Sequence, residues 1–515
     1  MTTLLPDTQK PRVTQTFAKL SAVSLEAFDH VIFVIPKDLP ARAWSSLPDA
    51  PKLQKLLKRA KKHGAVAQVR SHINNRNTTG VTLVEMDVGE SWPDSFSLLS
   101  KARSILTDAL TDKPSSLAIA TPGFSELQAG EVCRALLLAT YAVDFDMPEF
   151  KGAGSKSKSP TAKTRVKKVT VFGKRNNQMI DRTVAEAGNL NLARWLTALP
   201  PNKLDARAYR KLVKDLAKQY GWQVKVHDEA ALKKAGAGAF LAVSQGNAKS
   251  DAAIIQISYR PQKKSGKGSA PDLALVGKGI IFDTGGTNLK PFKGMLDMHE
   301  DMAGSAVALS TLAALTELKA PVAVDCWLAI TENRIGPEAY KPRDIVTASN
   351  GTTIEVIHTD AEGRMALADT LALAGKKQPK LIIDYATLTG SCVAALTERY
   401  SGAFTNRDTL HGLIREAGKD SGERIWTFPM DDDFDEEIQS KVADVLQCAP
   451  AGGGDHIQAA RFLKRFVPEQ SAWVHVDLSS SNRPGGLAQV PGGPTGFGIR
   501  FTLDLILNKK ALKTI

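Results

Sequence analysis

The sequence predicts an α/β fold with two domains: a smaller N-terminal α/β domain and a larger C-terminal α/β domain with a mixed central sheet. Short apolar segments typical of buried strands alternate with longer helical segments, and this alternation predicts sheets covered by helices. The chain has 515 residues, more than one ordinary domain contains. We therefore expect domains at residues 1–176 and 201–515, joined by a linker helix at 177–200.

Strands and helices are expected to alternate through the N-terminal domain. Strands are predicted at 29–35, 80–86 and 116–120, and helices at 53–62, 100–110 and 126–143. Residues 152–164 are polar and rich in Ser, Gly and Lys, which is typical of a loop. We expect 166–172 to form an edge strand of the same domain. A helix over 181–199 should end at Pro200 and Pro201, because proline cannot continue a helix.

The C-terminal domain is expected to hold a second set of buried strands. Strands are predicted at 224–226, 253–259, 272–276, 322–330, 353–357 and 381–385, and helices at 209–220, 303–318 and 365–374. The four cysteines are scattered and lack the spacing of metal-binding pairs, so we expect free, buried thiols. They are Cys133, Cys326, Cys392 and Cys448.

The distribution of charge and hydropathy along the chain indicates which partners and which location to expect. The formal net charge is +13, but residues 151–175 alone carry nine Lys and Arg and no acid. A basic loop at about 151–168 would give at most a weak, salt-sensitive contact with nucleic acid or another polyanion, and a solvated loop is the alternative. No segment resembles a membrane span or a secretory signal, so we expect a cytoplasmic protein with no membrane partner.

Seven consecutive residues, 358–364 (His-Thr-Asp-Ala-Glu-Gly-Arg), lie between a predicted strand and a predicted helix and include several side chains that can bind a metal or an anion. Asp360 and Glu362 can converge on one cation at this junction, and the helix N-terminus suits anionic groups. Arg364 offers a planar fork for an oxyanion or a small carboxylate. Taken alone, the two acids could also be capping residues with no other role.

A second polar group precedes this motif by about eighty residues. In the segment 276–286 (VGKGIIFDTGG), Lys278 and Asp283 are expected in a glycine-punctuated turn after a buried strand. Lys290 and Asp301 follow. The two groups together contain four carboxylates, which can share a pocket only if cations neutralise them. Two divalent metal ions about 3.5–4 Å apart would do so.

These segments resemble the leucyl (cytosol) aminopeptidase family of two-metal exopeptidases. The resemblance runs from about residue 199 to 501 and includes both motifs, the segment 384–391 (DYATLTGS) and a C-terminal region at 475–500, all in the family's order. It implies an enzyme that releases N-terminal amino acids, leucine-like residues preferred, from short peptides during intracellular peptide turnover. It also implies a homohexamer.

The resemblance assigns roles to individual residues. Two divalent ions, zinc or manganese with magnesium or cobalt as alternatives, would be held by Lys278, Asp283, Asp301, Asp360 and Glu362. Lys290 would polarise the scissile carbonyl and stabilise the oxyanion. Arg364 would hold a bicarbonate ion that acts as general base toward the metal-bridging water. The substrate would be contacted by Thr387, Leu388 and Gly390, with Met298 lining the side-chain pocket.

The chain departs from the family pattern mildly at Thr284 and Met365 and more clearly at two other places. His358 stands where the family has Asn, and we expect its ring to point away from the metals. Residues 479–494, which help to shape the specificity pocket in the family, differ from the usual sequence. His299 and Glu300 are expected to be supporting or surface residues. Two alternative functions stay open: a nucleic-acid-binding protein with secondary peptidase activity, and a dedicated dipeptidase such as one for cysteinyl-glycine.

Overall fold

The computed structural model describes residues 4–6, 10–62, 68–88, 92–151, 166–173, 175–261, 270–451 and 453–515. Most of the basic loop expected at about 151–168 lies outside these residues. The contacts divide the chain into an N-terminal unit (Asp7–Asn191 with Gly485–Pro491) and a C-terminal unit (Met1–Pro6, Leu192–Pro484 and Gly492–Ile515). The boundary near residue 191 falls inside helix α6 (Asn177–Thr197). Each unit has the α/β architecture that the sequence predicts.

The N-terminal unit contains a six-stranded sheet in the order β1-β6-β5-β2-β4-β3. Its strands are β1 (Arg12–Thr16), β2 (His30–Pro36), β3 (Gln68–His72), β4 (Gly80–Met86), β5 (Ser116–Ala120) and β6 (Lys168–Phe172). Neighbouring strands are parallel except β3, which runs antiparallel to β4. Strands β2 and β4 are buried along their whole length, as expected of parallel strands covered on both faces.

Strand β6 is not the edge strand that the sequence predicts. Strand β1 pairs with it in parallel, and Val13 lies opposite Val169. The sequence of β1, Arg-Val-Thr-Gln-Thr, contains one apolar residue and therefore carries little hydrophobic signal. Pairing nevertheless satisfies the backbone groups of β6 on that side, and the Thr14 and Thr170 hydroxyl oxygens lie 2.9 Å apart.

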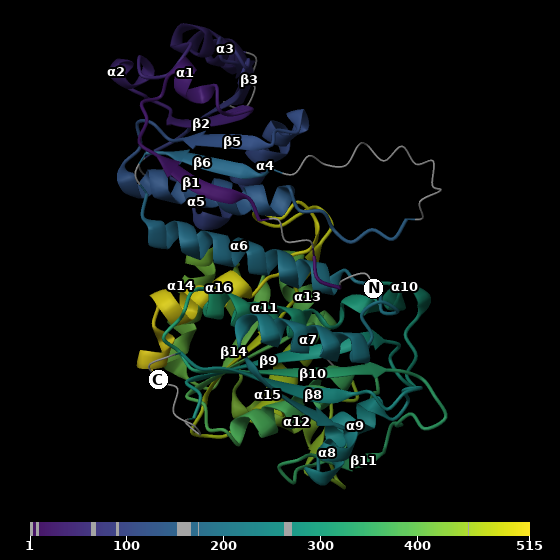
Figure 1. Ribbon diagram of the computed structural model, residues 1–515. Coiled ribbons are helices and arrows are strands. Elements are labelled where there is room, and N and C mark those ends of the chain that lie inside the picture. The colour runs from purple at the N-terminus through teal and green to yellow at the C-terminus, as the bar shows by residue number, and fades with distance from the viewer. Residues whose placement is uncertain are drawn as a thin grey trace. The chain divides into compact units, whose positions relative to one another are not determined.

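Helices cover both faces of this sheet (Figure 1). One face packs on α4 (Ser95–Ala109) and α5 (Glu126–Val143), and the other on α1 (Ala22–Leu25), α2 (Ala41–Trp44) and α3 (Ala50–Lys62). Helix α5 begins at a capping box, in which Ser125 and Gln128 satisfy each other's backbone N–H groups. Cys133 lies in this core, and all four cysteines are free and buried as expected.

The C-terminal unit is built on an eight-stranded mixed sheet in the order β15-β14-β17-β13-β9-β10-β8-β7. Its strands are β7 (Gln223–Asp228), β8 (Ala253–Tyr259), β9 (Leu273–Asp283), β10 (Val324–Asn333), β13 (Leu381–Ala386), β14 (Ser401–Thr405), β15 (Ile425–Thr427) and β17 (Ala472–Asp477). The central strands β17, β13, β9 and β10 are mutually parallel, so their carboxyl ends meet at one edge. Strands β8 and β14 run antiparallel to this central group, which confirms the mixed sheet.

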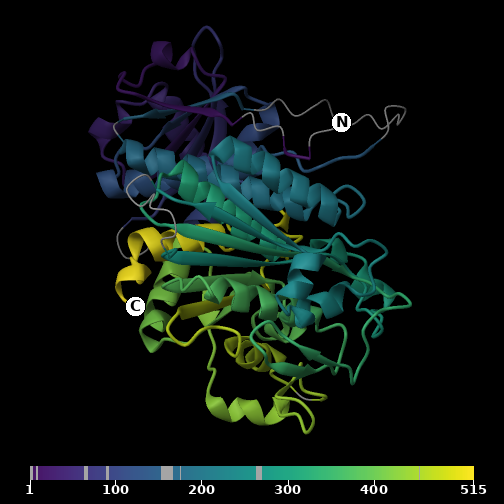
Figure 2. The same cartoon turned by 60° about the horizontal axis from the view of Figure 1, so that its bottom comes forward.

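Helices also cover both faces of the central sheet (Figures 1 and 2). On one face lie α7 (Ala206–Tyr220) and α11 (Ala303–Glu317), and on the other α9 (Gly238–Ser244), α12 (Glu362–Gly375) and α15 (Asp455–Lys464). A side chain at Gly277 of β9 would place a Cβ 2.5 Å from the Cα of Ser305 in α11. Glycine in β9 therefore lets α11 pack directly on the strand.

Smaller elements complete the C-terminal unit. They are the sheets β11 (Ile345–Thr347), β12 (Thr353–Glu355) and β16 (Val445–Leu446), and β18 (Asn482–Arg483) with β19 (Gly493–Pro494), and the helices α8 (Glu229–Lys234), α10 (Phe292–Met295), η4 (Met298–Glu300), α13 (Gly390–Leu396), α14 (Asp408–Ser421) and α16 (Ile499–Leu503). None of the helices in the described part of the chain combines the length and apolar character needed to cross a bilayer.

The first polar motif has a different local structure from the expected one. Strand β9 does not stop at Val276 but continues to Asp283. Lys278 is therefore a strand residue, and Asp283 is the last residue of the strand rather than part of a turn. The sequence suggested a turn because Gly277 and Gly279 normally weaken a strand. Pairing with β10 and contact with α11 override that preference.

Candidate active site

A cavity of about 360 Å³ lies at the carboxyl ends of the central parallel strands. This is the edge at which open α/β sheets commonly bind ligands. All eleven site residues proposed from the sequence line this cavity. They are Lys278, Asp283, Lys290, Met298, Asp301, Asp360, Glu362, Arg364, Thr387, Leu388 and Gly390.

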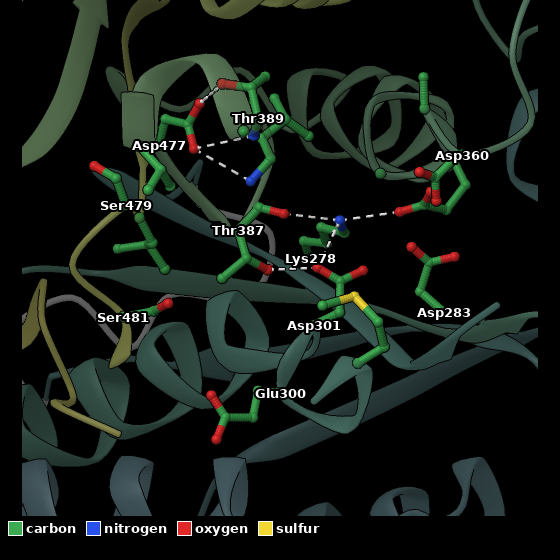
Figure 3. Close-up of a pocket in the computed structure, with 18 of the residues that line it drawn as sticks. Lys278, Asp283, Glu300, Asp301, Asp360, Thr387, Thr389, Asp477, Ser479 and Ser481 are labelled. Atoms are coloured by element: carbon green, nitrogen blue, oxygen red, sulfur yellow. Dashed lines mark hydrogen bonds and ion pairs between the residues drawn. The ribbon is translucent and has the colours of Figure 1, made fainter. Parts of the chain in front are cut away.

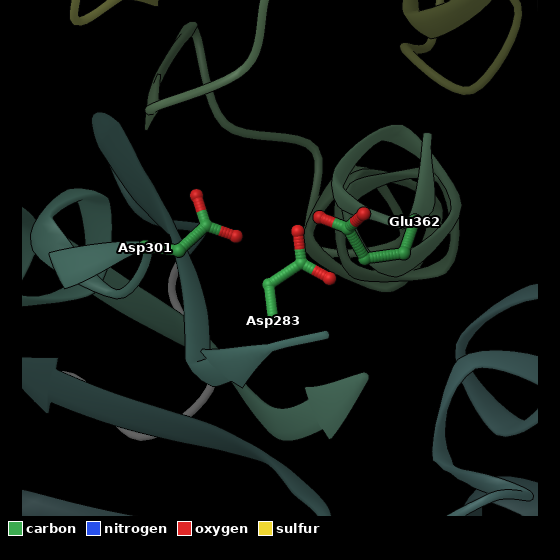
Figure 4. A group of neighbouring side chains, drawn as sticks. All are labelled: Asp283, Asp301 and Glu362. Atoms are coloured by element: carbon green, nitrogen blue, oxygen red, sulfur yellow. The ribbon is translucent and has the colours of Figure 1, made fainter. Parts of the chain in front are cut away.

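The carboxylates at the centre of the cavity come from three separate elements. Asp283 ends β9, Asp301 follows η4, and Glu362 begins α12. One carboxylate oxygen from each of these three buried residues lies within 4.8 Å of the others (Figure 4). Packing of β9, α11 and α12 thus brings together side chains that are almost eighty residues apart in the sequence.

Two lysines lie between these acids. The Lys278 Nζ is 2.8 Å from Asp301 Oδ1 and 3.0 Å from Glu362 Oε1, and it donates a hydrogen bond of 2.9 Å to the Thr387 carbonyl. A Cβ at Gly363 would lie 2.7 Å from the Lys278 Nζ. Glycine between Glu362 and Arg364 is therefore what leaves room for this lysine.

The second lysine joins the other pair of acids. The Lys290 Nζ lies 2.8 Å from Asp283 Oδ2 and 2.5 Å from Asp360 Oδ1. Burial alone would lower the pKa of Lys290, but the neighbouring carboxylates raise it above its usual value. Both lysines are thus held as ammonium groups in the metal-free chain, and four carboxylates face two positive charges.

Burial and repulsion between neighbouring carboxylates raise the pKa values of three of these acids. Burial, with further repulsion from neighbouring carboxylates, raises the pKa of Asp301 to about 8. Burial likewise raises the pKa of Asp360 to about 6 and that of Glu362 above its usual range. Such shifts in a cavity indicate a functional site, because the arrangement becomes favourable only when additional positive charge is present.

The donor set fits divalent metal ions. Asp301 Oδ2 is buried and has no hydrogen-bond partner among the described residues, so one ligand oxygen is free. Carboxylate oxygens bind Mg²⁺, Mn²⁺ and Zn²⁺. Lys278 could act as a ligand only after losing its proton, which a nearby dication promotes.

Asn333 supports the acids and was not identified from the sequence. It ends β10 and lies opposite Asp283 in the parallel register. Its Nδ2 donates to Asp283 Oδ1 at 2.8 Å and to the Thr359 carbonyl at 3.0 Å. The Tyr340 hydroxyl donates to the same carbonyl at 2.8 Å. The available signal was a polar residue ending the strand next to β9.

Arg364 is buried and largely satisfied by the chain itself. Its Nη2 lies 2.8 Å from both carboxylate oxygens of Asp455, and its Nη1 donates to the Gln447 carbonyl at 3.3 Å. Its Nε has no partner among the described residues. Asp455, at the start of α15, was not identified from the sequence. Arg364 therefore keeps its Nε–H and one Nη1–H for an external anion.

His358 does not line the cavity. Its backbone N–H donates to Gln447 Oε1 at 3.0 Å, and its ring Nδ1 accepts from the Asp360 N–H at 3.3 Å. Burial and the nearby Lys290 lower the pKa of His358. The imidazole thus bonds to the backbone of the motif and lies outside the carboxylate cluster, in agreement with the expectation from the sequence.

The turn after β13 forms another wall of the cavity (Figure 3). Thr387 Oγ1 donates to Asp301 Oδ1 at 2.7 Å. Asp477 accepts from the Leu388 N–H at 3.2 Å and from Thr389 Oγ1 at 2.6 Å. These bonds fix the backbone that faces the cavity. Glu300, expected to be a supporting or surface residue, lies in the cavity wall near Met298.

Comparisons with known proteins agree with this geometry. The model of the cytosol aminopeptidase family, catalytic domain, matches residues 191–503. A probable cytosol aminopeptidase of Wolbachia pipientis wMel is 39% identical over 366 residues, covering 69% of this chain and 72% of the relative. Across the most similar curated relatives, the aligned segments span from 61% to 75% of their lengths.

Two solved structures share the fold. A mutant of tomato leucine aminopeptidase superposes with a TM-score of 0.79 at 26% identity, covering 98% of each chain. The bottromycin maturation enzyme BotP in complex with Mn gives a TM-score of 0.76 at 27% identity, covering 93% of this chain and 98% of BotP. With these likenesses and the matched catalytic domain, the chain belongs to the cytosol aminopeptidase family of metal-dependent peptide hydrolases.

Proposed function

We propose that this protein is a metal-dependent aminopeptidase that removes N-terminal amino acids from short peptides. The observation that carries the proposal is the convergence of four carboxylates and two lysines on one cavity, with more negative than positive charge. Two divalent ions, zinc or manganese with magnesium or cobalt as alternatives, would be held by Lys278, Asp283, Asp301, Asp360 and Glu362. Bound there, they would activate water and accept the free amine of the substrate.

The remaining residues would bind and polarise the peptide. Lys290 would donate to the scissile carbonyl oxygen and stabilise the negative charge that develops there. The backbone of Thr387, Leu388 and Gly390, fixed in part by Asp477, would orient the peptide chain. Arg364 would use its remaining N–H groups to hold bicarbonate, which would receive a proton from the attacking water.

The likenesses support further parts of the proposal. The wall of the cavity contains Met298, Leu388, Val393 and Leu478, which suit a leucine-like N-terminal residue. The structurally similar BotP is in complex with Mn, and we infer manganese among the working metals of this protein. The relatives are named cytosol aminopeptidases, and we infer a cytoplasmic enzyme. We also propose that it assembles as the homohexamer that the family resemblance implies.

The proposal is tested by hydrolysis of leucine p-nitroanilide with added Mn²⁺ or Zn²⁺, together with elemental analysis of bound metal. We expect turnover in the wild type and loss of both turnover and metal in Asp360→Asn and Glu362→Gln. A panel that includes cysteinyl-glycine separates a general aminopeptidase from a dedicated dipeptidase. A folded, metal-supplied protein that cleaves none of these substrates would contradict the proposal.

A further inference from the structure

One part of the cavity wall carries a carboxylate that the metal cluster does not use. Glu300 lines the cavity two residues after Met298, on the short helix η4. Figure 3 shows it set apart from Asp283 and Asp360. Its side chain is half-buried, and it makes no ion pair with any described residue. A charge in this position is costly to bury without a counter-ion.

The cationic groups that line the cavity form ion pairs with acids other than Glu300. Lys278 and Lys290 pair with the four central acids, and Arg364 pairs with Asp455. Asp297 also lines the cavity and adds a second negative charge. The wall around Met298 and Glu300 is therefore acidic.

Asn482 fixes the orientation of this carboxylate. Its Nδ2 lies 2.8 and 2.6 Å from the two Glu300 oxygens. Asn482 belongs to β18, which pairs with β19, inside the segment 479–494 that departs from the usual family sequence. Hydrogen bonds from a neutral amide hold the carboxylate without neutralising it, so its charge stays available to a ligand.

We propose that Glu300 selects substrates whose N-terminal residue is lysine or arginine. This inference rests on the proposed aminopeptidase function and goes beyond a leucine-like preference. With the substrate amine at the carboxylate cluster and the peptide along Thr387 to Gly390, the first side chain extends toward Met298 and Glu300. The aliphatic stem of lysine or arginine packs on the apolar wall, and its cationic head reaches the Glu300 carboxylate.

The experiment compares lysyl-, norleucyl- and leucyl-p-nitroanilide in the wild type, Glu300→Gln and Glu300→Asp. Norleucine matches the lysine stem without the charge, so the lysyl-to-norleucyl ratio of kcat/KM isolates the charge. We expect the wild-type ratio to exceed one and to fall about tenfold in Glu300→Gln, as for one lost charge-assisted bond. Glu300→Asp should retain part of the preference, and added NaCl should weaken lysyl cleavage only.

Two controls keep the interpretation specific. The exposed Glu436 offers a matched change, Glu436→Gln, which should leave the ratio unaltered. Calorimetric binding of the free amino acids lysine and norleucine, which have no amide bond to cleave, to the wild type and Glu300→Gln tests recognition without turnover, and thermal unfolding checks that each variant folds.

An equal loss of kcat/KM for all three substrates in Glu300→Gln would overturn the proposal, because Glu300 would then anchor the common amine or support the fold. A wild-type ratio of one or less, unchanged in the variant, would overturn it as well. Failure to cleave any substrate would contradict the aminopeptidase function, whereas the calorimetric comparison would still decide whether Glu300 recognises the cationic side chain.

Discussion

Two buried groups of charged side chains, one in each unit, differ in how far cations compensate their carboxylates. In the N-terminal unit, the fully buried Glu186 meets two arginines, with Arg134 Nη2 at 3.0 Å and Arg182 Nε at 2.8 Å. In the cavity of the C-terminal unit, four carboxylates face two lysines. Burial of charge therefore does not by itself mark a functional site. A deficit of countercharge does, because some ligand must supply it.

The largest expected effect comes from removing a carboxylate from the unbalanced cluster. Asp360→Asn or Glu362→Gln should lower kcat/KM by roughly 1,000-fold, because electrostatic stabilisation in an active site is worth several kcal/mol. The same variants should lose the rise in melting temperature that Mn²⁺ gives the wild type. Metal content by elemental analysis and scanning calorimetry measure the two effects. Full activity with full metal content in either variant would contradict the assignment.

Removing the charge of Glu186 in the N-terminal unit should instead lower stability and leave activity unchanged. Glu186→Gln leaves two arginines without their shared carboxylate, and breaking such a buried pair costs about 3 kcal/mol of unfolding free energy. Denaturation in urea should show this loss, whereas kcat and bound metal per folded molecule should stay at wild-type values. The exposed Glu436→Gln is the matched control and should change neither quantity. Loss of metal in Glu186→Gln would remove the distinction between the two regions.

A buried histidine gives the N-terminal unit a pH dependence of its own. The ring of His30 is 1% exposed, and its Nε2 lies 2.9 Å from Thr82 Oγ1. Burial lowers the pKa of His30 from 6.5 to about 4. Between these values the unfolded chain binds the proton and the folded chain does not.

The unfolding free energy should therefore fall as the pH drops below 6.5. The loss should approach about 3 kcal/mol near pH 4 and below. The difference between the wild type and His30→Gln isolates this contribution from the titration of the carboxylates. Parallel stability profiles for the two proteins over this range would show that His30 is already protonated in the folded state.

Most of the fold follows from hydrophobic patterning, and the exceptions have local causes. The mainly apolar segments of β2, β4 and β13 predict buried parallel strands, because two covered faces demand apolar residues on both. Strand β1 was not predicted, because backbone pairing, not an apolar face, stabilises it. The extension of β9 through Gly277 and Gly279 was not predicted, because the close packing of α11 on the strand is a tertiary contact that the local sequence does not indicate.

The residues of the site likewise fall into two groups, those that the sequence indicates and those that it does not. Acids and lysines in two recognisable motifs could be placed together from the sequence, because their types and order indicate a metal-dependent hydrolase. Asn333, Asp455 and Glu300 could not. Asn333 reaches the site through the register of β10 with β9, Asp455 through the start of the distant helix α15, and Glu300 through the one-turn helix η4. Asn333, a polar residue at a strand end, and Glu300, an acid beside Asp301, gave weak signals, but neither signal shows that the side chain contacts the site.

The smallest expected effect concerns Arg364, which is intermediate between the two regions. It is a buried cation whose counter-ion, Asp455, is 39% exposed, and its Nε has no partner among the described residues. Asp455 occupies Nη2, so we expect it to limit the part of the guanidinium that bicarbonate can reach. We expect added bicarbonate to change wild-type kcat only slightly. In Asp455→Asn it should raise kcat about tenfold, the value of one hydrogen bond to a charged group.

A second measurement separates this effect from a purely structural role of Asp455. In metal-free protein, bicarbonate should raise the melting temperature of Asp455→Asn and leave that of the wild type unchanged, because only the variant has an uncompensated buried guanidinium. Chloride at equal ionic strength is the control. Equal responses of the two proteins to bicarbonate would mean that Asp455 and the anion bind different edges of Arg364. The N–H groups that Asp455 leaves unused would then form the whole anion site, and Asp455 would have a fixed cationic partner as Glu186 has.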